Sequence, residues 1–347
     1  MDKLRPTQKD IARVAKVTQA TVSLALGDHP RLALETRRRI QAIARKLGYV
    51  PDPYLSGLAA HKKKRRPPQF QATLAWVTNW PAGGRRWRDI TTFLHYFEGS
   101  VERAGELGYR IEEHDLTKPG MSPRRLEQIL GAKNIPGILF APQPHAHVTL
   151  DLRLERFSSV AFGYSLASPL LHRVTNHHFR AAQTLFQLLL ARGYRRPGLV
   201  IESDNELRVG SIHSSAFLHA QQSLPPKDRV PALIDADLTR KRFFAWYRQH
   251  RPDVVVSLWD VVYPWLNDAG VRVPEDVGVA LLSVRYLDGH FAGMWENPRL
   301  VGARAVELLI DLVHRGERGI PEIPSCLMIE STWVEGKTIR PASVSAA

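Results

Sequence analysis

The sequence predicts an α/β protein in which a small all-α segment precedes a larger core of two α/β lobes. Three observations support this prediction. Apolar residues recur at helical spacing within residues 7–47. After residue 70, short apolar runs alternate with amphipathic stretches, which is typical of parallel sheets covered on both faces. The roughly 270 residues of that second part exceed a comfortable single sheet, so two lobes are expected.

The first helix of the N-terminal segment is expected to begin after Thr7. The side chain of Thr7, followed three residues later by Asp10, resembles a capping box. Three apolar residues then share one face of this helix: Ile11, Val14 and Ala15.

Two further helices are expected at short intervals. Thr18 is a good N-cap for a helix over Gln19–Leu26, and the turn-forming residues 27–30 end that helix. A third helix covers about 34–47, where apolar residues repeat at a period of 3.6. Because only residues 16–18 separate the first two helices, the segment has the tight turn that a helix-turn-helix needs.

A short helix and a basic linker are expected to follow. Residues 52–60 start with an N-cap and a proline, but Gly57 lies inside, so this helix should need a partner surface to stay folded. The run HKKKRRPP favours a solvated linker or additional phosphate contacts. The predicted domains are a headpiece with its hinge helix over 1–60, a linker over 61–69 and a two-lobed core over 70–347.

The core is expected to alternate strands with helices. The predicted strands are Ala72–Val77, Gly137–Phe140, Ser159–Gly163, Pro197–Ile201, Val254–Ser257 and Val277–Ser283. The predicted helices are about 89–108, 122–132, 177–192, 211–223, 239–249, 260–269 and 299–315.

Positive charge is concentrated at the N-terminal end. The chain carries a net charge of +14, and residues 1–66 hold 16 Lys and Arg against 5 Asp and Glu. The remaining residues hold 32 against 29. This asymmetry favours a phosphate-binding module attached to a near-neutral body, although a solvated basic tail would show the same charge.

Other features of composition narrow the class of protein. The single cysteine, Cys326, excludes a disulfide within the chain and a cysteine-based metal site. The polar start MDKLRPTQKD does not resemble a signal peptide, and no run of eighteen apolar residues is present. We therefore expect a cytoplasmic protein without a membrane partner.

Several motifs of the N-terminal segment carry a resemblance to a known family. They are TQKDIARVA at 7–15, VTQATVS at 17–23, TRRRI at 36–40 and ARKLGYVP at 44–51. In order, spacing and residue type they resemble the headpiece of the LacI/GalR family of bacterial repressors, without a gap through Ala59. Weaker echoes are FEG at 97–99, ELGY at 106–109, VPEDVG at 273–278 and NPRLVG at 297–302.

The resemblance implies a fold and a function. The core would have the two-lobed, periplasmic-binding-protein-like α/β fold of the family. The protein would be a transcription regulator, expected to act as a repressor. It would bind a pseudo-palindromic operator in double-stranded DNA as a homodimer, under the control of a small-molecule effector in the core cleft.

The second helix would present its first turn to base edges in the major groove. Gln19 can pair bidentately with adenine, Ala20 can contact a thymine methyl group, and Ser23 lies on the same face. Leu24 stands where many members of the family carry a second base-reading side chain, often arginine, so its base preference should differ. Lys16 stands where the turn commonly has glycine, so either the lysine accepts a strained backbone or the turn differs.

Phosphate contacts are expected from short hydroxyls and one guanidinium: Thr7, Thr18, Thr21, Thr36 and Arg37. Helix capping is an equally good explanation for the first two of these hydroxyls. A cap and a phosphate contact are compatible, because a capped helix N-terminus also attracts phosphate.

The hinge helix carries the residues expected in the minor groove. By resemblance, Leu58 occupies the position whose leucine wedges between the central base pairs and kinks the duplex. Leu55 and Ala59 are expected to pack against the partner's hinge helix. The alternative is that Leu55 and Leu58 form an ordinary apolar pair packed on the core.

Three core residues align approximately with effector-pocket positions of the family: Trp80, His213 and Asp260. The tryptophan is alternatively a packing residue and the aspartate a helix N-cap. His213 replaces an arginine that is common in the family, and residues 283–285 lack its usual glycine and acid. The effector class, a sugar, nucleobase or similar metabolite, is therefore left open.

Enzyme classes find little support in the sequence. We find no dinucleotide, P-loop, zinc-protease or nucleophile-elbow motif, and no paired catalytic carboxylates, so no catalytic residue, metal or cofactor is expected. His177 and His178 are interpreted as surface or capping residues, since neighbours on a helix point to different faces. The alternatives are a solute-binding protein and a sugar-processing enzyme built on the α/β core.

Overall fold

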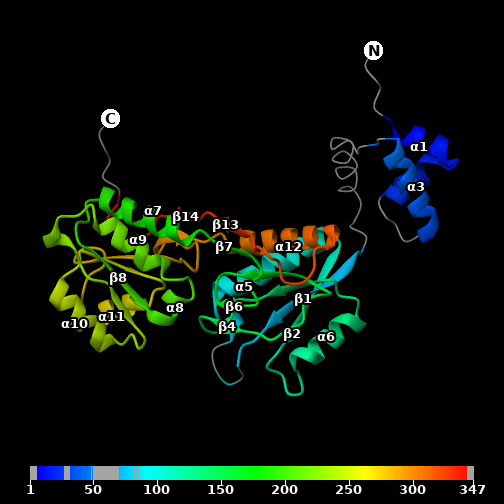
Figure 1. Ribbon diagram of the computed structural model, residues 1–347. Helices are drawn as coiled ribbons and strands as arrows, with labels where there is room; N and C mark the ends of the chain where they lie inside the picture. Colours follow the sequence, from blue (N-terminus) through cyan, green and yellow to red (C-terminus); the bar gives the residue numbers. More distant parts are fainter. Residues whose placement is uncertain are drawn as a thin grey trace, which may run out of the picture. The chain divides into compact units, whose positions relative to one another are not determined.

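The chain folds as two compact units, Met1–Pro68 and Gln69–Ala347. The structure is a computed structural model, and it describes residues 6–26, 32–47, 49, 70–81, 83 and 86–341. The second unit contains two lobes, each built around a six-stranded sheet (Figure 1). The expected hinge residues Leu55, Leu58 and Ala59 lie outside the described residues, as do the turn residues 27–30.

The first unit contains the three expected helices, α1 (Gln8–Ala15), α2 (Gln19–Leu26) and α3 (Leu34–Lys46). They enclose a small core of apolar side chains: Ile11, Ala12, Ala15, Val22, Ala25, Ile40 and Ala44. The prediction that Val14 shares a face with Ile11 and Ala15 is wrong, because those two are buried while 52% of Val14 is exposed. The buried face of α1 is centred between Ala12 and Ala15, so Val14 falls on its flank.

The first lobe of the core has a sheet of parallel strands in the order β13-β7-β5-β3-β1-β2. These strands are β1 (Ala72–Thr78), β2 (Tyr109–Asp115), β3 (Gly137–Phe140), β5 (Ser158–Phe162), β7 (His172–Asn176) and β13 (Cys326–Ile329). Helices α5 (Thr91–Glu106) and α12 (Pro298–Arg315) cover one face, and α6 (Pro123–Ala132) covers the other. A small pair of strands, β4 (Val148–Thr149) and β6 (Leu166–Ser168), completes this lobe.

The second lobe has a sheet in the order β14-β12-β11-β10-β8-β9, parallel except for β14. Its strands are β8 (Pro197–Glu202), β9 (Leu233–Asp235), β10 (Val254–Ser257), β11 (Gly278–Leu281), β12 (Ala292–Trp295) and β14 (Thr332–Val334). Helices α7 (His178–Ala191) and α9 (Ile212–Gln221) cover one face of it. Helices α10 (Arg240–His250) and α11 (Val262–Asp268) cover the other. The short helix α8 (Ser203–Leu207) follows β8.

The chain passes between the lobes at three places. It leaves the first lobe after β7, returns after β12, and crosses again between β13 and β14. Helix α12, coloured orange in Figure 1, therefore packs beside α5 on the first lobe although it lies near the C-terminal end. This topology confirms the predicted two-lobed α/β core with both sheets covered on both faces.

Several strands of the two sheets were not predicted from the sequence. They are β2, β7, β9, β12, β13 and β14. β2 and β9 lie at sheet edges and mix charged with apolar residues, so they lack a continuous apolar run. Three of the four residues of β13 are exposed, so this strand also lacks a buried apolar pattern. It pairs with β7 because the chain comes back to the first lobe after β12.

Candidate functional site

Helix α2 presents an exposed face that carries the expected base-reading residues. Gln19, Ala20 and Ser23 are exposed, and Leu24 is half-buried beside them. Its opposite face is buried, mainly through Val22. The helix thus offers polar and small side chains outward from a rigid apolar base, as a recognition helix requires.

The hydroxyls expected at phosphates include two that cap helices. The Thr18 hydroxyl accepts a hydrogen bond from the Thr21 N–H at 3.1 Å and shares a 2.8 Å hydrogen bond with the Thr21 hydroxyl. The Asp10 carboxylate accepts from the Thr7 N–H at 2.9 Å and from its hydroxyl at 2.7 Å. Capping is therefore observed for Thr7 and Thr18, and their phosphate contacts stay a prediction.

The turn between α1 and α2 contains a lysine in a left-handed conformation. Lys16 has φ 54° and ψ 45°, and its N–H points to the carbonyls of Ala12 and Arg13 at the end of α1. This conformation costs about 1–2 kcal/mol for a residue with a Cβ. Of the two alternatives, the lysine accepts the strained backbone and the tight turn is kept.

Helix α3 carries the remaining expected phosphate contacts. Thr36 and Arg37 near its start are half-buried. The charges that the sequence analysis did not single out are more exposed and lie on the same helix: Arg38, Arg39, Arg45 and Lys46. A run of arginines with lysine is the signal that could have identified them.

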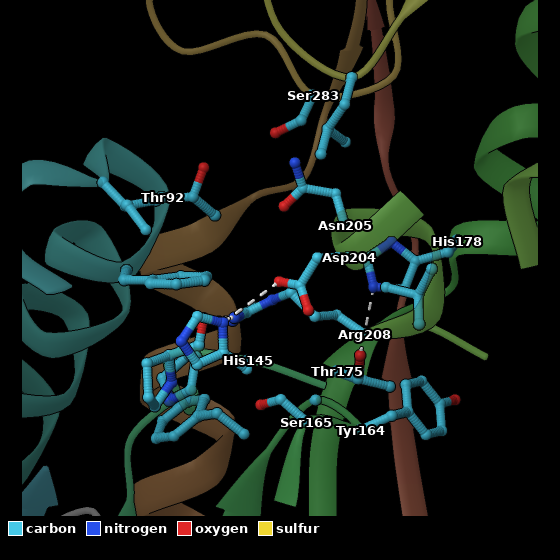
Figure 2. Close-up of a pocket in the computed structure, with 18 of the residues that line it drawn as sticks. Thr92, His145, Tyr164, Ser165, Thr175, His178, Asp204, Asn205, Arg208 and Ser283 are labelled. Carbon is cyan, nitrogen blue, oxygen red and sulfur yellow. Dashed lines mark hydrogen bonds and ion pairs between the residues drawn. The ribbon is translucent and has the colours of Figure 1, made fainter. Parts of the chain in front are cut away.

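A cavity of about 420 Å³ lies between the two lobes of the core. The first lobe contributes Thr92, Phe93 and Tyr96 from α5, and the second contributes Asp204 and Asn205 from α8. In Figure 2, the α5 side chain of Thr92 lies across the cavity from those of α8. Both lobes therefore supply its walls, so a bound molecule would contact both.

Aromatic rings make up much of the cavity wall: Trp80, Phe93, Tyr96, Phe162, Tyr164 and Trp259. Trp80, one of the expected pocket residues, is 9% exposed, and its indole N–H donates to the Pro142 carbonyl at 2.8 Å. Because that hydrogen bond fixes the ring, Trp80 presents an oriented aromatic surface to the cavity.

His213 also lines the cavity, and it pairs with a buried carboxylate. Its Nδ1 lies 3.2 Å from Glu206 Oε2, and both side chains are almost fully buried. Burial acts to raise the pKa of Glu206, but the hydrogen bond and charge of His213, together with the Ser214 N–H, outweigh it and lower that pKa. The imidazole is thus held by an acid of its own lobe.

Asp260 is not among the residues that line the cavity. Its carboxylate lies 3.5 Å from the Arg285 guanidinium, which also lies over the ring of Trp259 at 5.1 Å. The neighbouring Trp259 takes the place at the cavity wall. The structure therefore brings two of the three expected pocket residues together and turns the third towards an arginine.

The two adjacent histidines at the start of α7 have different surroundings. His177 caps the helix, accepting from the Arg180 N–H at 3.5 Å, as expected. The expectation of a surface position is wrong for His178, which lines the cavity (Figure 2). Its ring packs edge-on against His213, and burial together with the two neighbouring histidines lowers its pKa to about 3. His178 is therefore a neutral imidazole at ordinary pH, able both to donate and to accept a hydrogen bond.

A buried carboxyl group completes the inner wall. Glu296 is 7% exposed, and the Tyr96 hydroxyl donates to its Oε2 at 3.3 Å. Burial raises the pKa of Glu296, and hydrogen bonds from Ser283 and Tyr96 offset this only in part. The cavity thus combines ring surfaces with hydrogen-bonding groups.

Most of the polar residues that line the cavity were not predicted from the sequence. Asp204, Asn205 and Arg208 follow β8, where SDN stands at the carboxyl end of a predicted strand. Ligands of parallel α/β folds bind at this end, so that run was an available signal. Tyr96 and Glu296 carried no comparable signal, because they are about two hundred residues apart and meet only in the folded lobe pair.

Two further findings concern metals and membranes. Within the described part of the chain, no group of three or more His, Cys, Asp and Glu side chains is arranged to hold a metal ion. Among the same residues, no helix is both long and apolar enough to span a bilayer.

Comparison with known proteins agrees with the geometry. Residues 7–52 match the family described as bacterial regulatory proteins, lacI family, and residues 186–339 match the periplasmic binding protein-like domain. The HTH-type transcriptional regulator MalR of Staphylococcus xylosus is 22% identical over 89% of this chain and 91% of its own. The sucrose operon repressor of Escherichia coli is 27% identical over 78% and 82%.

A solved structure has a similar fold over almost the whole chain. The Lac repressor dimer bound to operator and the anti-inducer ONPF superposes with a TM-score of 0.54 at 16% identity, over 96% of this chain and 99% of that one. Because a lacI-family headpiece precedes the second domain and the relatives are transcription regulators, a stand-alone solute-binding protein and an enzyme are both excluded. The chain combines a lacI-family headpiece with a periplasmic binding protein-like domain, is similar to regulators of the LacI family, and is a DNA-binding transcription regulator.

Proposed function

We propose that the protein represses transcription as a homodimer whose two headpieces bind the half-sites of a pseudo-palindromic operator. The exposed face of α2, with Gln19, Ala20 and Ser23 above a buried base, is the observation that supports this most directly. A symmetric dimer requires a symmetric site. The Lac repressor relative is itself a dimer on its operator.

The contacts on each half-site divide into two kinds. Gln19, Ala20, Ser23 and the half-buried Leu24 face the base edges, so they would determine the operator sequence. The hydroxyls of Thr7, Thr18, Thr21 and Thr36, with Arg37, would position the headpiece on phosphates. Because Leu24 offers only apolar contact, a thymine methyl group is the expected partner at its position.

The hinge is proposed to act in the central minor groove. Leu58 would wedge between base pairs, with Leu55 and Ala59 against the partner's hinge helix. Such a short helix is marginal alone and would fold on DNA, so its folding provides the point at which effector control acts.

We propose a sugar or sugar-like ring as the effector. Oriented aromatic rings such as Trp80 can stack on the apolar face of a sugar, and Asn205, Ser283 and Glu296 can pair with its hydroxyls. The cavity size suits a small molecule. A relative is named for the sucrose operon. A ligand in contact with both lobes would shift the population between their arrangements.

DNA recognition is tested by selecting duplexes from a random pool with the full-length protein. We expect a palindromic consensus. Gln19→Ala should weaken binding of the selected duplex about 10–100-fold, because the bidentate contact of the glutamine with a base is lost. Binding of random duplex should not change. Gln222→Ala, an exposed glutamine of the core unit, is the matched control. Enrichment without a palindrome, or equal losses on both duplexes, contradicts the proposal.

The effector is tested by thermal denaturation of the full-length protein with a panel of mono- and disaccharides. A binding sugar should raise the midpoint of thermal denaturation, and above its Kd the rise should grow with the logarithm of the sugar concentration. Asn205→Ala should reduce that rise, whereas Gln222→Ala should not. If no sugar raises the midpoint while a nucleobase does, the sugar class is excluded.

A further inference from the structure

One buried asparagine touches all three segments that connect the lobes. Asn176 is the last residue of β7, at the first crossing, and is 1% exposed. Its side-chain amide donates to the Glu296 carbonyl at 3.2 Å and to the Ile329 carbonyl at 3.1 Å. Its side-chain oxygen accepts from the Ser331 hydroxyl at 2.9 Å.

These partners lie on the other two crossings. Glu296 stands between β12 and α12, Ile329 is the last residue of β13, and Ser331 stands between β13 and β14. An asparagine amide has two N–H groups and one oxygen, and here two donor contacts and one acceptor contact are made with the two segments. Aspartate keeps the shape but loses both donors, so the match requires the amide.

One of the partners also faces the cavity. The Glu296 side chain lines it and accepts from Tyr96 of the first lobe, while Ser283 of the second lobe also bonds to it. The same residue therefore presents its carboxyl group to a ligand and its carbonyl group to Asn176.

We propose that Asn176 is a positioning residue that couples occupancy of the cavity to the angle between the lobes, acting through Glu296. This rests on the proposed function, in which the ligand shifts the lobe arrangement. A ligand that moves the Glu296 carboxyl moves its main chain, and the shared amide passes that movement to the other crossings. Without the amide, the crossings would shift independently, since buried carbonyls would lose their common donor.

The first test measures the distance between the lobes in the full-length protein. Spin labels are placed through Arg124→Cys on α6 and Gln249→Cys on α10, both exposed, in a Cys326→Ser background. Pulsed electron paramagnetic resonance should show one narrow distance distribution. Asn176→Ala and Asn176→Asp should each widen it at least twofold.

The control for simple loss of a buried hydrogen bond is Thr338→Val. Thr338 is 1% exposed and accepts from the Ala292 N–H at 3.1 Å within the second lobe. The Thr338→Val variant should have a lower midpoint of thermal denaturation, but its distribution of distances between the lobes should be no wider than that of the parent. Equal widths in the parent and in both Asn176 variants overturn the proposal. Asn176→Asp keeps the test decisive if the alanine variant fails to fold.

The second test is a double-substitution cycle on binding of the selected duplex. Glu296→Gln alters the cavity carboxyl and should change duplex affinity at least fivefold when Asn176 is present. In the Asn176→Ala background the change should fall below twofold. Equal changes in both backgrounds, or none in either, overturn the coupling. If the wild-type protein selects no duplex, the proposed function is contradicted instead. The distances between the lobes then still test the role of Asn176.

Discussion

Two ionisable side chains of the cavity have pKa values shifted in opposite senses by the same burial. Burial lowers the pKa of His178 to about 3, and it raises the pKa of Glu296 above 4.5. Burial thus disfavours the charged form of both groups, the imidazolium of His178 and the carboxylate of Glu296.

These shifts predict a pH dependence of stability. Between pH 6.5 and about 3, the unfolded chain binds a proton at His178 that the folded chain does not, so stability falls as the pH falls. Glu296 acts oppositely: folding raises its pKa, so its contribution to stability is present below pH 4.5 and is lost as the pH rises through its folded pKa.

His178→Gln should therefore reduce proton uptake on unfolding by about one proton between pH 6.5 and 5. The measurement is the dependence of urea unfolding on pH. His145→Gln, which removes an imidazole that is 72% exposed at the cavity wall, is the control. An unchanged slope in the His178 variant would show that this imidazole is not held neutral.

Lys16 and Asp260 differ in how far their conformations could be predicted from neighbouring residues in the sequence. Lys16 was recognised as standing in a turn that commonly has glycine, and its left-handed φ follows from that local turn. The outward turn of Asp260 depends instead on Arg285, which a different loop brings within 3.5 Å. A local signal could predict the first but not the second.

At the scale of elements, two glycines allow α5 and α12 to pack closely. A Cβ at Gly99 would lie 2.1 Å from the Arg299 carbonyl oxygen, and one at Gly302 would lie 2.1 Å from that of Tyr96. Both glycines belong to the weak family echoes FEG and NPRLVG. The structure thus supplies the physical reason for those echoes: backbone meets backbone at the helix crossing.

Gly99→Ala should destabilise the protein by roughly 1–3 kcal/mol or more, because the helices must separate. Gly105→Ala is the matched control on the same helix, where an added Cβ meets nothing within 4 Å. That variant should be neutral or stabilising by up to about 1 kcal/mol from helix propensity. Chemical denaturation measures both, and similar effects of the two substitutions would refute the packing argument.

Long periodic helices and buried strands were predictable from local pattern. The predicted Gln19–Leu26, Gly137–Phe140 and Val254–Ser257 match the observed bounds. The edge strands β2 and β9 were not predicted, because half-exposed strands tolerate charge and show no apolar run. The strand β12 contains no β-branched residue, so its local pattern carries little strand signal.

At the scale of the whole molecule, the proposed hinge makes DNA specificity depend on two chains. Leu58→Ala should weaken binding of the selected operator well beyond its effect on random duplex. The reason is that the leucine is inserted between base pairs, and stabilises the kink, only in the specific complex. Competition binding at fixed salt measures both affinities. Gln222→Ala, the exposed substitution in the core unit, is again the control, and equal losses on both duplexes would exclude a wedge at Leu58.

The family resemblance, the three-helix headpiece and the two-lobed α/β core could all be predicted from the amino-acid sequence. These follow from helical periodicity, caps and motif spacing, which act over a few residues. The cavity and its connections, in contrast, arise only in the folded protein. Tyr96 meets Glu296, and Asn176 joins Glu296 to Ser331, across more than a hundred residues of chain. Such contacts depend on how the chain crosses between the lobes, and no local pattern encodes that path.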